Sequence, residues 1–69
     1  MILLTLVDNR TDNEIGYRKW PVCPQVNTHI AYDSYPWVVK GVVHGDWVQD
    51  PEEGDAIIAE VTLYVEGLG

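Results

Sequence analysis

The chain contains few of the residues on which common binding and catalytic motifs depend. It has one cysteine, which excludes an internal disulfide, and its 4 lysines and arginines are outnumbered by 11 aspartates and glutamates. The net charge of −7 disfavours binding to duplex nucleic acid and to anionic membrane surfaces. The apolar run at residues 2–7 is much shorter than the about 20 residues of a membrane span, and it lacks the basic start of a signal peptide. We therefore expect a cytoplasmic protein.

Helical periodicity is also missing. No window of about 11 residues places apolar side chains at helical spacing without an interrupting glycine, proline or β-branched cluster. The 46% of hydrophobic residues is nevertheless enough for a folded chain, and 69 residues suffice for one domain, which we place at residues 1–69. A chain of this size hides only about 60% of its unfolded surface, so association with a second subunit would help to stabilise it.

Strand signals are frequent along the chain. β-Branched and alternating apolar residues predict strands at residues 2–7, 14–20, 26–32 and 37–44, and a last strand that begins near residue 56. Polar turns, two prolines and the acidic loop 50–55 separate these strands. The pattern predicts an all-β fold, either a five-stranded antiparallel small SH3-like barrel or a strongly curled sheet. The expected core comprises Leu4, Leu6, Val26, Ile30, Val39, Val43, Val61 and Leu63.

The predicted fourth strand carries valine on both faces. Trp37, Val39 and Val43 lie on the face that would fill the barrel, whereas Val38 and Val42 lie on the reverse face. A strand that is apolar on both faces is usually covered on both. The cover could be another segment of the chain, a second subunit or a ligand. We predict a homo-oligomer that associates through Val38 and Val42.

The residues with metal-binding or nucleophilic chemistry do not form a recognisable motif. Cys23, His29, His44 and Asp46 lack the paired spacing of a zinc site, and a reactive thiolate needs an electropositive setting that this acidic chain does not offer. We expect the carboxylates of the acidic loop to be solvated, which prevents the raised pKa of a general acid. The sequence predicts no enzyme, no metal and no cofactor.

The remaining group of interest combines cations with aromatic rings. A cation beside a ring can bind one small anion, because arginine or lysine contacts a phosphate and the ring stacks on a base. The alternative is that these are ordinary strand residues whose cations lie over tryptophan faces. The candidate ligand-binding residues are Tyr17, Arg18, Lys19, Trp20, Trp37 and Lys40.

Two segments carry a resemblance to known proteins. Residues 24–44 contain Pro-Gln-Val-Asn-Thr-His-Ile followed by Tyr-Pro-Trp-Val-Val-Lys-Gly-Val-Val-His, and residues 61–66 form an apolar strand. These segments resemble short phage and bacterial proteins that fold as small β-barrels, although Asn27 stands where those proteins often have a turn glycine. The resemblance implies a small barrel, in the host cytoplasm if a phage encodes it. By analogy, such small viral proteins include inhibitors of bacterial immunity, some of which sequester nucleotide signals in sites shared between subunits.

Two functions follow from these observations. The first is a non-catalytic binding protein that sequesters a small anionic ligand of nucleotide type, such as a cyclic nucleotide, at a subunit interface to counter host defence. The second is an acidic module or inhibitor that occupies a basic site on a partner protein, which the net charge of −7 and the acidic loop favour.

Overall fold

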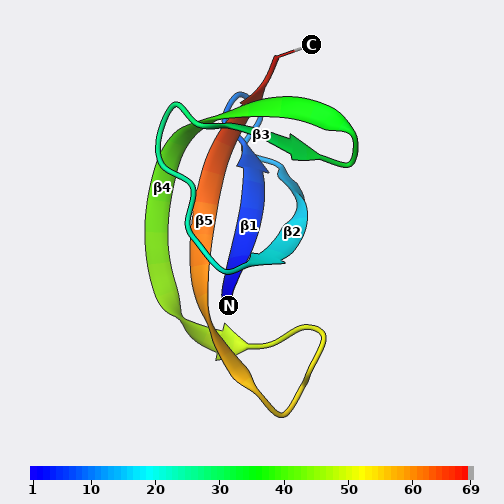
Figure 1. Ribbon diagram of the computed structural model, residues 1–69, viewed down its shortest axis with the longest axis vertical. Coiled ribbons are helices and arrows are strands. Elements are labelled where there is room, and N and C mark those ends of the chain that lie inside the picture. The colour runs from blue at the N-terminus through cyan, green and yellow to red at the C-terminus, as the bar shows by residue number, and fades with distance from the viewer. Residues whose placement is uncertain (69) are drawn as a thin grey trace.

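Five β-strands form one curled sheet in the computed structural model, which describes residues 1–68 (Figure 1). The strands are β1 (Ile2–Asp8), β2 (Glu14–Trp20), β3 (His29–Tyr32), β4 (Tyr35–Gln49) and β5 (Ile57–Gly67). Their order across the sheet is β2-β1-β5-β4-β3, and the sheet curls into a half-barrel. The predicted all-β fold with a curled five-stranded sheet is confirmed.

The sheet is mixed, whereas the sequence predicted an antiparallel one. β1 pairs with β5 in parallel, with Leu4 opposite Val61 and Leu6 opposite Leu63, and the other pairs are antiparallel. The cause is the connection at residues 21–28, which carries the chain from one edge of the sheet to the other before β3 begins. The chain then returns through two hairpins. β5 therefore arrives beside β1 and runs in the same direction.

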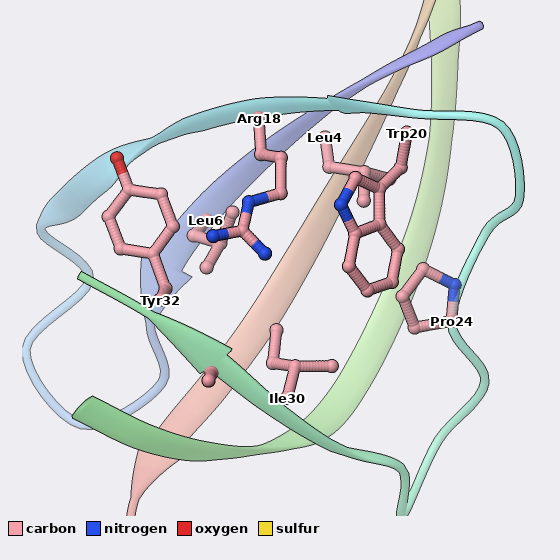
Figure 2. Close-up of a pocket in the computed structure, with 8 residues that line it drawn as sticks. Leu4, Leu6, Arg18, Trp20, Pro24, Ile30 and Tyr32 are labelled. Atoms are coloured by element: carbon pink, nitrogen blue, oxygen red, sulfur yellow. The ribbon is translucent and has the colours of Figure 1, made fainter. Parts of the chain in front are cut away.

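The two edges of the sheet, β2 and β3, approach each other through side chains. Figure 2 shows Arg18 of β2 between the rings of Trp20 and Tyr32. The guanidinium carbon of Arg18 lies 5.5 Å from the ring centroid of Trp20 and 5.5 Å from that of Tyr32. A Cβ atom at Gly16 would overlap the hydroxyl of Tyr32, so glycine at this position lets Tyr32 reach β2. These contacts cover the open side of the half-barrel.

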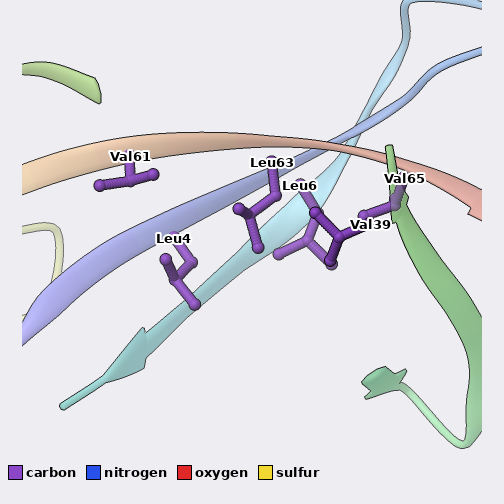
Figure 3. Packing of buried hydrophobic residues seen from close by; sticks show 6 residues of the cluster. All are labelled: Leu4, Leu6, Val39, Val61, Leu63 and Val65. Atoms are coloured by element: carbon purple, nitrogen blue, oxygen red, sulfur yellow. The ribbon is translucent and has the colours of Figure 1, made fainter. Parts of the chain in front are cut away.

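The core lies on the inner face of the sheet (Figure 3). Burial of each leucine or valine side chain stabilises the fold by about 1.5 to 3 kcal/mol relative to exposure. The prediction is confirmed for Leu4, Leu6 and three residues of β4 and β5, and Ile30 packs against them while partly buried. The buried cluster consists of Leu4, Leu6, Val39, Val61, Leu63 and Val65.

A β-bulge in β4 corrects the predicted faces of this strand. Val39 is opposite Val65 but Gly41 is already opposite Tyr64, so Lys40 is an extra residue and the side-chain alternation reverses after it. Val43, predicted to be buried, is therefore 53% exposed. Val42 instead packs against the core.

The same bulge changes the predicted oligomer interface. Val38 and Val42 do not share a free face, because Val42 contacts the core and Val38 is only 8% exposed. These two residues therefore do not form the exposed apolar face on which the predicted interface was based, and the oligomer itself stays a prediction.

The start of the third strand also differs from the prediction. Val26 is 51% exposed, because residues 25–28 form a turn rather than a strand. The N–H of Thr28 donates to the carbonyl oxygen of Gln25 at 3.1 Å, and Asn27 has a φ of 74°. Asparagine tolerates this left-handed conformation better than most residues. Asn27 can therefore occupy the turn position at which the similar small proteins often have glycine.

The β3–β4 hairpin offers a way to stabilise the protein. Asp33 and Ser34 have φ values of 55° and 64°, as in a two-residue type I′ turn, for which Asn-Gly is the preferred sequence. Because a left-handed conformation is strained for serine and not for glycine, we expect Ser34→Gly to raise the free energy of unfolding by about 1 kcal/mol. Urea denaturation measures the change. Ser34→Ala should give no such gain, and an equal gain in both variants would contradict the explanation.

Candidate functional site

The predicted ligand-binding residues do not meet at one place. Side chains alternate along β2, so Tyr17 and Lys19 lie on the face of the sheet opposite to Arg18 and Trp20. Lys40 is exposed at the bulge in β4. Trp37 lies near the start of β4, opposite Gly67 of β5. A ligand needs room and free polar groups, and these positions differ in both.

Arg18 and Trp20 take part in the side-chain contacts with Tyr32 that join the edges β2 and β3, which we call the β2–β3 closure. The cavity below Arg18 has a volume of about 10 Å³ and is lined by side chains such as Leu4, Leu6 and Ile30. This volume holds at most about one water molecule. Two of the candidate residues are thus brought together, but the space between them has no room for a nucleotide.

Lys19 is held by an ion pair with Asp50. Its Nζ atom lies 2.7 Å from Oδ2 of Asp50 and 3.7 Å from a carboxylate oxygen of Glu52. The Oδ1 atom of Asp50 accepts hydrogen bonds from the backbone N–H groups of Glu52, at 2.8 Å, and Glu53, at 3.3 Å. Lys19 is therefore not a free cation for a ligand.

The Asp50 side chain was expected to be solvated with the rest of the acidic loop, and this is wrong, because Asp50 is only 5% exposed. The hydrogen bond from Lys19 and the two backbone N–H groups lower the pKa of Asp50. The hydrogen bond to Asp50 in turn raises the pKa of Lys19. Asp50 thus anchors the acidic loop to β2.

A larger hollow surrounds Trp37, at the end of the sheet where β1 and β5 finish and β4 begins. We call it the Trp37 hollow; it has a volume of about 410 Å³ and is lined by Asp8, Arg10, Tyr35, Trp37 and Gly67. The rings of Tyr35 and Trp37 are tilted by 59° with centroids 5.0 Å apart. A Cβ atom at Gly67 would lie 2.9 Å from the Tyr35 ring, so glycine is needed for this ring position.

The polar groups of the Trp37 hollow come from β1 and the loop that follows it. The N–H of Asn9 donates to the carbonyl oxygen of Val65 at 2.8 Å, which fixes the loop against β5. The backbone N–H of Arg10 donates to Oδ1 of Asp8 at 2.9 Å. Within residues 1–68 the guanidinium of Arg10 forms no ion pair, and the buried Nε1 of Trp37 has no hydrogen-bond acceptor. The hollow thus combines a cation, a carboxylate and two aromatic rings.

Sequence reasoning included Trp37 but missed Asp8, Arg10 and Tyr35. These residues are brought together by the parallel pairing of β1 with β5, which places the end of β1 next to the start of β4. An antiparallel arrangement would have placed them apart. No local sequence signal marks this neighbourhood.

A second hollow lies between the 21–28 connection and β4. It has a volume of about 360 Å³, and its lining includes Cys23, Val26, Val42 and His44. Cys23 and His44, two of the four residues with metal-binding chemistry, therefore line the same hollow. In the part of the chain that the structure describes, no group of three or more histidine, cysteine, aspartate or glutamate side chains has the geometry to hold a metal ion.

Residues 1–68 contain no helix that is long and apolar enough to cross a membrane. Comparison of the chain with protein-family models, with curated proteins and with solved structures finds no match.

Proposed function

We propose that the protein is a non-catalytic binding protein that sequesters a small anionic ligand of nucleotide type in the Trp37 hollow. The observation that supports this proposal is the position of Arg10, a cation without an ion-pair partner in residues 1–68, beside the rings of Tyr35 and Trp37. The volume of about 410 Å³ falls within the range of small-molecule sites, about 300 to 1,000 Å³.

Each group in the hollow has a role toward such a ligand. A base stacks on the ring of Tyr35, which is 41% exposed, an interaction worth about 1 to 3 kcal/mol. The planar guanidinium of Arg10 donates two parallel hydrogen bonds to a phosphate. Asp8 accepts an amino N–H of the base, because only its Oδ1 atom is used by the backbone of Arg10.

The charge of the protein narrows the choice of ligand. A net charge of −7 repels multiply charged anions, and Lys19, which could have offset this repulsion, is neutralised by Asp50. Cyclic mononucleotides carry one negative charge together with a base that can stack. They therefore fit the Trp37 hollow better than nucleoside triphosphates do.

Titration calorimetry with cyclic AMP and cyclic GMP tests this function. We expect stoichiometric binding without turnover of the nucleotide. A denaturation experiment gives a second readout, because a ligand present at 100 times its dissociation constant adds about 2.7 kcal/mol to the free energy of unfolding. Arg10→Ala removes a charge-assisted contact and should weaken binding by at least about tenfold.

Lys40→Ala serves as the matched control, because it removes an exposed cation that lies outside the hollow. Binding that survives Arg10→Ala but is lost in Arg18→Ala would place the ligand at the β2–β3 closure instead. The absence of binding to any mononucleotide at millimolar concentration would reject the proposed function.

A further inference from the structure

One edge of β4 has no strand partner over most of its length. β3 pairs with β4 from Tyr35 to Val38, and the backbone of Val39 bonds to residues 27 and 28. β5 occupies the other edge of β4 as far as Gln49. From residue 40 to residue 49 the outer edge of β4 is therefore unpaired within residues 1–68, and Figure 1 shows it at the margin of the sheet. An unpaired edge is a template for another strand.

The side chains near this edge are suited to a contact. Val43 is 53% exposed and Trp47 is 69% exposed, so apolar surface accompanies the free backbone groups. Charges occur only at Lys40 and Asp46, and neither residue forms an ion pair within residues 1–68. A partner strand would therefore need a carboxylate and a cation at matching positions.

The two charged residues coincide with the two bulges of β4. The register with β5 shifts between Val39 and Gly41, at Lys40, and again between His44 and Trp47, where Gly45 and Asp46 lie. A regular stretch of strand lies between the bulges, and Val43 is equally far in sequence from Lys40 and from Asp46. Two residues of opposite charge, each at a bulge, thus flank Val43 at equal distances in sequence.

We propose that this edge pairs with the same edge of a second copy of the chain, antiparallel about a two-fold axis at Val43. In this register Lys40 of each copy faces Asp46 of the other, and Gly41 faces Gly45. Val43 faces its own equivalent, as the self-complementary interface of a two-fold dimer requires. The dimer is independent of the proposed function, because the Trp37 hollow shares no residue with this edge.

Charge complementarity selects both the partner and the register. A shift of one residue in either direction places Lys40 opposite Gly45 or Trp47 and loses both ion pairs. Two copies with a net charge of −7 repel each other, and the two Lys40–Asp46 pairs reduce this repulsion at the point of contact. A different partner strand would have to carry the same charge pattern, which the chain itself already supplies.

A charge-swap experiment tests the pairing. Sedimentation equilibrium of the full chain should give twice the monomer mass of 7.8 kDa. Lys40→Glu and Asp46→Lys should each weaken the dimer by at least about tenfold, because like charges then face each other at both ends. The double variant restores both pairs with the signs exchanged and leaves the net charge at −7, so it should dimerise as the original chain does.

Asp55→Lys is the matched control for Asp46→Lys, because it changes the charge equally on an exposed loop residue and should leave the dimer intact. A monomer at all concentrations up to the millimolar range would overturn the proposal. A double variant that remains as weak as the single variants would overturn the register.

Cross-linking provides an independent readout. Opposed residues of antiparallel strands have Cα atoms about 4.5 to 5.5 Å apart, which permits a disulfide. In a Cys23→Ala background, Val43→Cys should therefore form a covalent dimer with oxidised glutathione, which is reduced as it accepts the two electrons and protons of the thiols. Ile57→Cys, at a residue that is 70% exposed on β5, should stay monomeric. Equal cross-linking of both variants would contradict the two-fold pairing.

Discussion

Leu63→Ala is expected to lower the free energy of unfolding by about 2 to 5 kcal/mol. Leu63 is fully buried in β5, opposite Leu6 of β1 and Val42 of β4, so its loss leaves a cavity at the centre of the sheet. A core in a domain of this size rarely supplies more than about 3 to 5 kcal/mol. The variant should therefore be largely unfolded at room temperature, which circular dichroism in a urea titration measures.

The control for this substitution lies on the same strand and the same face. Ile57 is 70% exposed, so Ile57→Ala should change the free energy of unfolding by no more than about 0.5 kcal/mol. Similar losses in the two variants would mean that the buried cluster in Figure 3 does not determine stability.

Asp50→Asn is expected to lower stability in a way that depends on pH. The substitution keeps an oxygen for the N–H groups of Glu52 and Glu53 but removes the charge that faces Lys19, whose side chain is 19% exposed. The pKa of Asp50 is lowered in the fold, so its contribution is present above about pH 4 and is lost as pH falls through the lower folded value. The pKa of Lys19 is raised in the fold, so its contribution is fully present below about pH 10.5 and is lost as pH rises through the higher folded value.

Thermal unfolding of both proteins from pH 2 to pH 11 measures this dependence. The difference between the original chain and Asp50→Asn should be largest at neutral pH and should shrink in strong acid. Glu53→Gln provides the control, because Glu53 is exposed and its carboxylate has no contact with Lys19 within ion-pair distance. A difference that is constant across the acid range would show that the ion pair does not act through charge.

The last strand illustrates what the sequence could predict. Val61, Leu63 and Val65 alternate with polar residues, and this local pattern is enough to assign their face. β4 illustrates the limit. With valine at four positions around Lys40, the alternation is compatible with either face, and the bulge that decides between them is set by pairing with β5. The sequence pattern therefore predicts Val43 in the core and Val42 on the reverse face, whereas Val43 is exposed and Val42 packs against the core.

The candidate site was harder to predict than the fold, because it depends on contacts between distant residues. Lys19 was selected for its aromatic neighbours, but its partner Asp50 is 31 residues away along the chain. Arg10 has no aromatic neighbour in the sequence, so no local pattern points to it. Only the parallel pairing of β1 and β5 brings it to Tyr35 and Trp37.

The most direct test of ligand binding in the Trp37 hollow is the nuclear magnetic resonance spectrum of the indole N–H groups. The chain has 3 tryptophans, and they lie at the β2–β3 closure, in the Trp37 hollow and at the outer edge of β4. Titration with a cyclic mononucleotide should shift the Trp37 indole signal in proportion to saturation and leave those of Trp20 and Trp47 in place. An unchanged Trp37 signal at saturating nucleotide, or a shift confined to Trp20, would contradict binding in this hollow.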